Sequence, residues 1–338
     1  HTSTPRNHAN PAAAPPLGPR GGTSGKDAIA RQHAQRQKCR AVRNGYVSLR
    51  RSQIIEAGRL TDDTTVIKAR RQGEGPRAPF APPPVEQVVS MIRSEKPGVV
   101  FAPHVDTSSG ILIPDDYIRA VADAVHGHGG LFVLDCVASG GAWVNMTDCG
   151  VDVLLSAPQK GWSASPCAAL VMLSDAAVAR VAETSSSSFA CDLGKWLDIM
   201  RAYEGGGHAY HATLPTDALR QFRDTMLETG EFGFDRFCER QWELGRRVRE
   251  MLEKRGFESV AADGFKAPGV VVSYTDDPAI QNGSKFVSLG LQIAAGVPLM
   301  CDEGDDYRSF RVGLFGLDKL RDIDGAVQRL ADVIDRLH

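Results

Sequence analysis

The sequence lacks the features that would tie the chain to a membrane or to nucleic acid. No apolar stretch among its 338 residues approaches the length of about 18 that a membrane-spanning helix needs. The first residues carry no signal-peptide hydrophobic core. The net charge of -2 offers no excess of positive charge for a polyanion. We therefore expect neither nucleic acid nor a membrane as a partner.

The sequence also lacks paired cysteines. Its seven cysteines are odd in number, are scattered along the chain and never stand in a CxxC spacing. That pattern argues against a disulfide framework and against a zinc site, so we expect no bound metal. It is typical of a reducing compartment, and the expected localisation is cytoplasmic.

What the chain does have is a regular alternation of short apolar runs with amphipathic segments. Hydrophobic residues make up 42% and charged residues 24% of it, which is typical of a globular protein. Strand–helix alternation of this kind predicts an α/β fold with a mainly parallel sheet flanked by helices. The expected strands lie at 99–101, 131–135, 151–155 and 168–173, and the expected helices at 23–41, 85–93 and 114–125.

The length allows one large and one small domain. Residues 1–20 are rich in Pro, Ala, Asn and His and are expected to be disordered. We place a large domain at 21–230 and a smaller C-terminal α/β domain at 231–338, because a charged helical stretch at 216–256 is broken near 230–233. Short strands at 270–273 and 310–312 and a closing helix at 322–337 complete the expected order.

Two charged side chains each follow an apolar run that predicts a buried strand. Asp135 closes the run 131–134, and Lys160 follows the strand predicted at 151–155. A parallel sheet presents its chemistry at the carboxyl ends of its strands. An acid and a lysine there suit pyridoxal phosphate (PLP), because the lysine forms a Schiff base and the acid keeps the pyridine nitrogen protonated. The alternatives are a plain turn residue for Asp135 and a solvated loop lysine for Lys160.

Other segments could serve the same site. Gly21-Gly22-Thr23 precede a predicted helix, whose N-terminus would suit a phosphate, although a simple turn is the alternative. Residues 104–110 follow a predicted strand and offer hydroxyl groups, or form a turn cluster. The glycine-rich segment 205–216 suggests a mobile loop. Arg311 lies in an apolar strand and needs an acid, either an internal one or a substrate carboxylate.

In this order the segments resemble those of the class V aminotransferases of PLP fold type I. Within that group the chain is most similar to the alanine–glyoxylate and serine–pyruvate aminotransferases. The resemblance covers roughly residues 20–335. It rests on four motifs in register, namely LDCVASGG at 134–141, SAPQK at 156–160, YHATLP at 210–215 and RVGL at 311–314. It implies a large PLP-binding domain with a mainly parallel sheet and a smaller C-terminal α/β domain.

The resemblance assigns four residues to the cofactor ring. Lys160 would be the Schiff-base lysine, and Asp135 the partner of the pyridinium nitrogen. Val137 would pack on one face of the ring, and Thr107 would contact the region of the ring hydroxyl. Lys160 and Asp135 are therefore the expected catalytic residues.

The resemblance also implies how the phosphate and the substrate are held. The phosphate would be bound by the segment Gly21-Gly22-Thr23 and by Gln159. Tyr210 and Thr213 would reach the phosphate of the other subunit's cofactor, so the expected assembly is a homodimer with shared active sites. Arg311 would hold the substrate carboxylate.

The chain departs from the family pattern at three places. The family has Ser-Gly-Thr or a close variant where this chain has Gly21-Gly22-Thr23. An aromatic residue that stacks on the ring is expected soon after Asn44-Gly45, where Val47 stands with Tyr46 before it. The family also has a longer segment before the phosphate loop, so relative to the family the large domain is expected to be truncated at its start.

Three functions fit these residues. The first is a PLP aminotransferase that moves an amino group from alanine or serine to a 2-keto acid such as glyoxylate or pyruvate, by a ping-pong mechanism. The second is a cysteine-desulfurase-like lyase that uses Cys301. Acidic neighbours disfavour that thiolate, and Gln159 stands where desulfurases carry His. The third is a PLP-binding remnant without turnover.

Overall fold

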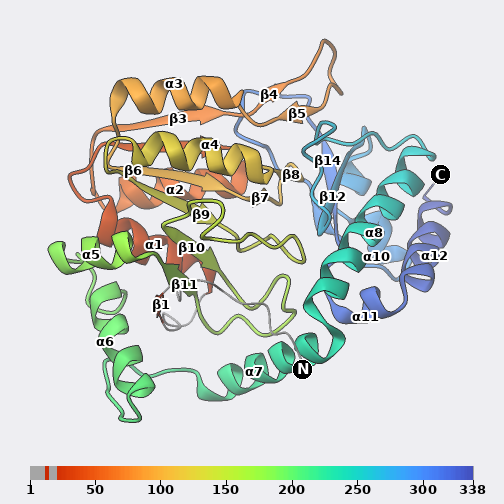
Figure 1. The fold of residues 1–338 in the computed structure, drawn as a ribbon. Coiled ribbons are helices and arrows are strands. Elements are labelled where there is room, and N and C mark those ends of the chain that lie inside the picture. The colour runs from red at the N-terminus through yellow and green to blue at the C-terminus, as the bar shows by residue number, and fades with distance from the viewer. Residues whose placement is uncertain (1–11, 15–20, 338) are drawn as a thin grey trace.

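The structure is a computed structural model that describes residues 12–14 and 21–337, and within these residues the larger part of the chain is built around a seven-stranded sheet (Figure 1). The strands across this sheet are, in order, β1 (Ala12–Ala14), β11 (Leu170–Leu173), β10 (Val153–Ser156), β9 (Leu131–Asp135), β6 (Val99–Pro103), β2 (Cys39–Arg43) and β3 (Thr64–Lys68). The five strands from β10 to β3 run parallel. β11 pairs antiparallel with β10, and β1 pairs antiparallel with β11.

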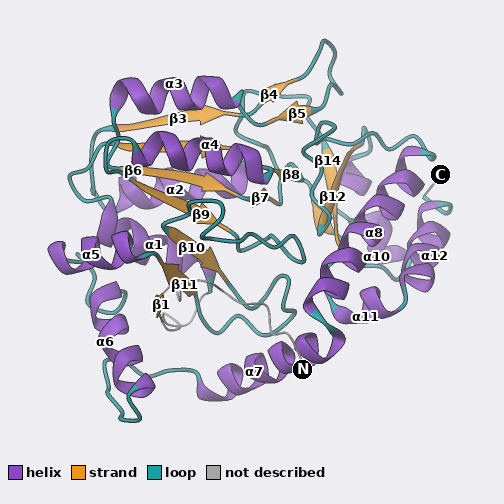
Figure 2. Ribbon diagram, viewed as in Figure 1, coloured by secondary structure: helices purple, strands orange, loops and turns teal. Residues whose placement is uncertain are grey.

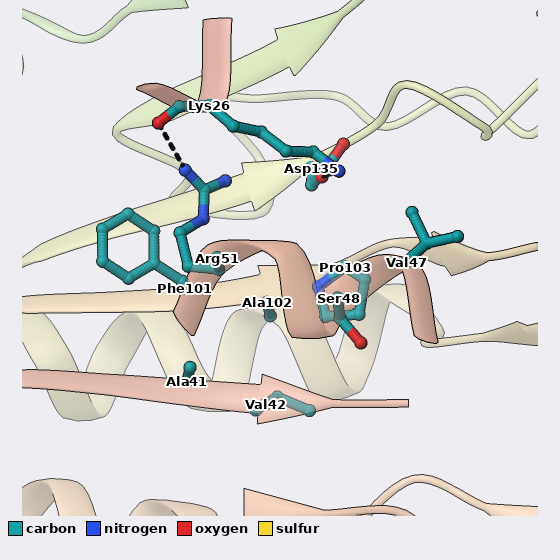
Figure 3. A pocket seen from close by; sticks show the side chains of 10 residues that line it. All are labelled: Lys26, Ala41, Val42, Val47, Ser48, Arg51, Phe101, Ala102, Pro103 and Asp135. Atoms are coloured by element: carbon teal, nitrogen blue, oxygen red, sulfur yellow. Dashed lines mark hydrogen bonds and ion pairs between the residues drawn. The ribbon is translucent and has the colours of Figure 1, made fainter. Parts of the chain in front are cut away.

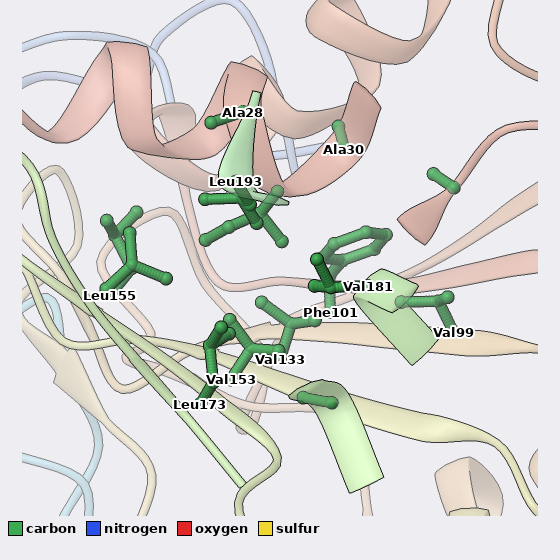
Figure 4. Packing of buried hydrophobic residues seen from close by; sticks show 14 of the residues in the cluster. Ala28, Ala30, Val99, Phe101, Val133, Val153, Leu155, Leu173, Val181 and Leu193 are labelled. Atoms are coloured by element: carbon green, nitrogen blue, oxygen red, sulfur yellow. The ribbon is translucent and has the colours of Figure 1, made fainter. Parts of the chain in front are cut away.

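Helices cover both faces of this sheet (Figure 2). One face packs against α1 (Gly22–His33), α2 (Tyr46–Ala57), α5 (Asp175–Glu183) and α6 (Leu193–Glu204), and the other against α3 (Val85–Glu95) and α4 (Asp115–His126). Successive side chains of a strand point to opposite faces. In β6, Val99 and Phe101 therefore enter the first core, drawn in Figure 4, while Val100 and Ala102 enter the second.

The C-terminal residues form a smaller α/β unit. Its antiparallel sheet has the strand order β12 (Val270–Tyr274), β14 (Ser309–Gly313) and β13 (Ala294–Ala295). The long helices α7 (Thr216–Phe232) and α8 (Phe234–Glu253) meet at Gly233, whose φ of 96° ends the first helix. The shorter helices are α9 (Pro278–Gln281), α10 (Ser284–Ser288), α11 (Leu317–Arg321) and α12 (Ile323–Ile334). The domain boundary expected near residue 230 lies close to this junction, and the division into two domains stays a prediction.

The two units meet at the carboxyl ends of the parallel strands. Two short hairpins lie there, β4 (Arg70–Arg71) with β5 (Phe80–Ala81) and β7 (Val105–Asp106) with β8 (Ile111–Leu112). Their apolar side chains pack against those of β12 in one core. The arrowheads of β3 and β6 point toward this junction (Figure 1). None of the helices in residues 12–14 and 21–337 has the length and apolarity needed to cross a membrane.

Two expectations about the first part of the chain were wrong. The helix expected at 23–41 ends at His33, and Cys39–Arg43 is a strand buried along its whole length. Arg40 interrupts the apolar pattern of this strand. The Arg40 side chain can be buried because its charge is balanced by Asp63 at 2.9 Å and by Glu95. Ala12–Ala14 form a strand, although disorder was expected there. The remainder of that segment, residues 1–11 and 15–20, lies outside the described residues.

Candidate active site

The two strands that were expected to carry the acid and the lysine are neighbours. β9 and β10 are parallel, and Asp135, the last residue of β9, lies opposite Leu155 of β10. β10 ends at Ser156, and the chain then turns through Pro158 to reach Lys160. The sheet order therefore brings Asp135 and Lys160 to the same edge.

The side chain of Asp135 is only slightly exposed and already has a charged partner. Its Oδ2 lies 2.7 Å from Nζ of Lys26, and the two side chains are only 12% and 6% exposed. Its Oδ1 accepts the backbone N–H of Val137 at 3.2 Å. Figure 3 shows the long side chain of Lys26 reaching from α1 to Asp135. No role at the site was expected for Lys26 from the sequence.

A second buried cation lies beside this ion pair. The Arg51 guanidinium of α2 donates to the backbone carbonyl of Lys26 at 3.0 Å and lies 4.4 Å from the centre of the Phe101 ring. Burial lowers the pKa of Arg51 to about 10, and the charge of Asp135 opposes that shift. A cavity of about 10 Å³ among these residues leaves room for about one water molecule (Figure 3).

The sequence does contain a pattern that indicates the burial of Lys26. Gly22, Lys26, Ile29 and His33 are buried at helical spacing on α1, so they form the stripe that faces the sheet. A lysine on such a stripe indicates a buried charge, and a buried charge needs a partner. The stripe does not say which acid that partner is.

Lys160 is suited to act as a neutral amine. It is half-buried, and no hydrogen-bond partner of its Nζ occurs in the part of the chain that the structure describes. Burial first, and then the positive charges of Arg311 and Lys26, lower the pKa of Lys160. An amine with a lowered pKa is available as a nucleophile or a base.

The turn before α1 lies directly against the segment of Lys160. Gly21 has a φ of 52°, and a Cβ there would lie 2.8 Å from Oε1 of Gln159. A Cβ on Gly22 would lie 2.7 Å from Cγ2 of Val137. Oε1 of Gln159 is buried and has no hydrogen-bond partner among the described residues. The free N–H groups of this helix N-terminus suit a bound anion. Oε1 can only accept a hydrogen bond, so the group of Gln159 that could bind an anion is the donor Nε2, which lies beside it at 2.9 Å from the Cβ position of Gly21. Thr23, by contrast, is exposed, and its hydroxyl accepts a bond from Arg50 at 3.0 Å.

Of the two candidates for contact with the ring, Val47 is the one that lines the small cavity beside Asp135. Tyr46 is 37% exposed, and its backbone N–H donates to Oγ of Ser108 at 2.7 Å. An aliphatic side chain thus stands where an aromatic one was expected.

Arg311 reaches the site from the small sheet. Its Nε donates to the carbonyl of Ala295 at 2.7 Å, and one terminal nitrogen lies 3.5 Å from the carbonyl of Thr107. Burial lowers the pKa of Arg311, while Asp106 and Tyr307 oppose that shift. In residues 12–14 and 21–337 no carboxylate forms an ion pair with Arg311. Thr107 is buried, and its backbone carbonyl is the atom that contacts Arg311.

Tyr210 and Thr213 do not lie at the site of Lys160 in their own chain. They stand in the connection between α6 and α7, and the Tyr210 hydroxyl lies 3.3 Å from Oγ1 of Thr213. Tyr210 is 77% exposed. The described part of the chain offers no contact between this pair and Lys160.

Two further polar groups bear on the choice of chemistry. His104, which follows β6, lies 2.6 Å from Oγ of Ser139, and burial lowers the pKa of His104 to about 4, so it is neutral. Burial, together with Asp106 and Glu303, raises the pKa of Cys301 to about 12, which disfavours a thiolate. Across the described ranges, no three His, Cys, Asp or Glu side chains gather closely enough to hold a metal ion.

Several curated relatives of the chain are named alanine–glyoxylate aminotransferase. No protein-family model matches the chain. The chain is 27% identical to the alanine–glyoxylate aminotransferase of Oryctolagus cuniculus over 259 residues, which are 74% of this chain and 62% of that protein. It is 27% identical to alanine–glyoxylate aminotransferase 1 of Saccharomyces cerevisiae over 251 residues, which are 69% of this chain and 61% of that protein. The chain thus spans about three fifths of the length of these curated relatives.

A solved structure with the same fold is that of alanine–glyoxylate aminotransferase from Nostoc sp. It superposes with a TM-score of 0.79 at 21% identity, and the match covers 97% of this chain and 82% of that chain. The expected resemblance to the alanine–glyoxylate aminotransferases is confirmed, as is the expected fold-type I α/β architecture.

Proposed function

We propose that this chain is a PLP-dependent aminotransferase that moves an amino group from a small amino acid, alanine or serine, to a 2-keto acid such as glyoxylate or pyruvate. The observation that carries the proposal is the half-buried, unbonded amine of Lys160, held at the same sheet edge as Asp135. The similarity to proteins named alanine–glyoxylate aminotransferase supports the choice of reaction.

The residues at this edge fit PLP. The backbone N–H groups at the turn of Gly21 and Gly22, with the donor Nε2 of Gln159, would hold the phosphate. Lys160 would hold the cofactor covalently through Nζ, and Asp135 would face the ring nitrogen. When bound, the cofactor supplies a ring that withdraws electrons from the substrate α-carbon.

The side chains themselves would move the proton and hold the substrate. In its neutral form, which the lowered pKa of Lys160 favours, the amine at Nζ can take a proton from the α-carbon of an amino acid within reach, and can return one to a keto acid. The two backbone carbonyls that bond Arg311 fix its guanidinium and leave its remaining N–H groups for a carboxylate. Two half-reactions at one amine are the basis of a ping-pong mechanism.

The proposal includes a homodimer with shared sites. Tyr210 and Thr213 are exposed and lie away from Lys160 of their own chain. A second subunit could receive them at its cofactor phosphate. We also place the protein in the cytoplasm, because all seven of its cysteines are free thiols, as a reducing compartment keeps them.

The test is an absorbance titration of the purified protein with PLP, followed by addition of L-alanine or L-serine. The proposal expects a visible band that bleaches with the amino acid. Borohydride reduction and peptide mapping should place the label on Lys160, and Lys160→Ala should abolish it. The exposed Lys195→Ala is the matched control and should keep it. A band that never bleaches would instead favour the remnant, and sulfide release from L-cysteine the lyase.

A further inference from the structure

The buried pair of Lys26 and Asp135 places a cation where the proposed cofactor needs a free acid. A carboxylate has about four acceptor positions. Asp135 uses one for Nζ of Lys26 at 2.7 Å and one for the N–H of Val137 at 3.2 Å. Positions remain for a ring nitrogen, but the negative charge of the carboxylate is already balanced.

Lys26 is held in this place by the packing of its helix. Gly25, the residue before it, has no room for a Cβ because of Leu155 and Ala169, so α1 lies close against the sheet. The carbonyl of Lys26 is bonded by the buried Arg51. The backbone of Lys26 therefore has little freedom, and its side chain, only 6% exposed, is held against Asp135.

The positive charge closest to the pair is Arg51. The groups that can carry charge around the pair are Arg51 from α2, Cys39 from β2, His104 after β6, Asp106 from β7, Cys136 after β9, Lys160 after β10 and Arg311 from β14. His104 is neutral, burial raises the pKa of both thiols, and the pKa of Lys160 is lowered. The negative charge of Asp106 acts on Arg311, so Arg51 is the positive charge that Asp106 leaves beside the pair. A nearby positive charge disfavours protonation of a further nitrogen.

We propose that Lys26 is a positioning residue that acts through Asp135, competing with the cofactor's ring nitrogen for the carboxylate and leaving that nitrogen less firmly protonated. This inference rests on the proposed function. In the protein without cofactor, Lys26 balances the buried charge of Asp135. When PLP enters, its ring nitrogen shares the acid with Lys26, so both the affinity and the protonation of the ring are lower than a lone aspartate would give.

The experiment compares the wild type with Lys26→Met, which keeps the length of the side chain but removes its charge. Lys26→Arg keeps the charge, and the exposed Lys195→Met is the matched control. Each protein is titrated with PLP and with pyridoxine 5′-phosphate, which has the ring and phosphate but no aldehyde. The dissociation constants and the pH dependence of the ring absorbance are measured.

Lys26→Met should bind both compounds about tenfold more tightly, and the pH at which the bound ring loses its proton should rise by about one unit, the equivalent of that tenfold change. Lys26→Arg and Lys195→Met should behave like the wild type. Unchanged or weaker binding by a folded Lys26→Met protein, with an unchanged pH profile, overturns the inference. If neither the wild type nor Lys26→Met binds either compound, the proposed function fails and takes the inference with it.

Lys26→Met leaves Asp135 unpaired and could lower folding yield. The double variant Lys26→Met/Asp135→Asn removes both charges together and avoids that cost. It should bind pyridoxine 5′-phosphate more tightly than Asp135→Asn alone, because in the single variant Lys26 remains as an uncompensated cation beside the ring. Equal binding by the two proteins overturns the inference.

Discussion

The side chain of Gln159 occupies the space that a Cβ on Gly21 would need. The predicted Cβ position lies 2.8 Å from Oε1 and 2.9 Å from Nε2 of Gln159, and Gly21 has a positive φ of 52°. Two segments that are far apart in the sequence therefore meet at a single residue, which connects the turn before α1 to the segment of Lys160.

Gly21→Ala should therefore impair cofactor binding more than it impairs folding. The backbone conformation of Gly21, with φ 52° and ψ -133°, costs about 1–3 kcal/mol for a residue with a Cβ, and the contact with Gln159 displaces that side chain from the proposed phosphate site. We expect the affinity for PLP to fall at least about tenfold, a free-energy change of about 1.4 kcal/mol. Gly206→Ala is the control, because Gly206 has a φ of 78° and no atom near its Cβ position. Equal PLP affinity in the two variants would contradict the proposed role of Gly21.

Arg311→Lys should selectively weaken reaction with carboxylates. A lysine offers a point charge, whereas the planar fork of Arg311 can make two charge-assisted bonds of about 1.5–3 kcal/mol each. We expect kcat/KM for amino acids and 2-keto acids to fall at least about 100-fold. An amine without a carboxylate should react as before, and the exposed Arg220→Lys should have no effect. An equal loss for all substrates, with a lower melting temperature, would indicate a structural arginine.

A mixture of two inactive chains should regain activity if the sites are shared. One chain carries Lys160→Ala, and the other carries Tyr210→Phe with Thr213→Ala. Each heterodimer then has one site with all three residues intact, so random mixing should restore about a quarter of the wild-type activity. Activity is measured after subunit exchange at low denaturant. No recovery, although mass spectrometry detects the heterodimer, would show that the sites are not shared.

His33 should make the protein less stable in acid. Burial, with a smaller effect of Arg180, lowers the pKa of His33 to about 4, and neither ring nitrogen has a partner among the described residues. The unfolded chain takes up a proton near pH 6.5, whereas the folded chain does so only near pH 4. Between these values the unfolded state binds more protons, so stability is lost as the pH falls.

His33→Leu should remove that part of the pH dependence. At about 1.4 kcal/mol per unit of pKa, the variant should be about 3 kcal/mol less destabilised than the wild type on going from pH 7 to pH 4. Urea unfolding at both pH values measures the difference. The control is His208→Leu. Because His208 is exposed, this substitution should leave the pH dependence of the unfolding free energy unchanged. Parallel curves for the wild type and His33→Leu would rule out this role of His33.

Much of the fold could be predicted because most buried strands are uninterrupted apolar runs. β6 and β9 and the two long C-terminal helices lie close to where their patterns placed them. β2 could not be found, because the buried Arg40 breaks its pattern and its partners Asp63 and Glu95 come from outside the strand. A pattern along one segment contains no information about charges that other segments supply.

The residues of the site also fall into those that could be predicted from the sequence and those that could not. Asp135 and Lys160 could be located because each follows a strand, and the sheet order places both at one edge. Lys26 could not be linked to Asp135, since that pair joins α1 to β9 across more than 100 residues of sequence. The roles of these residues toward a cofactor stay predictions until the titrations are made.

The burial of one stripe of α1 also limits how the gene can change. Gly22 at the start of the helix meets Val137, and Lys26, four residues later, meets Asp135. Each residue of an α-helix turns the chain by about 100°. A single codon inserted or deleted between these two positions would rotate one of them away from its partner. We therefore expect natural variants to exchange residues on the outer side of α1 freely, but to keep the spacing from Gly22 to Lys26 unaltered.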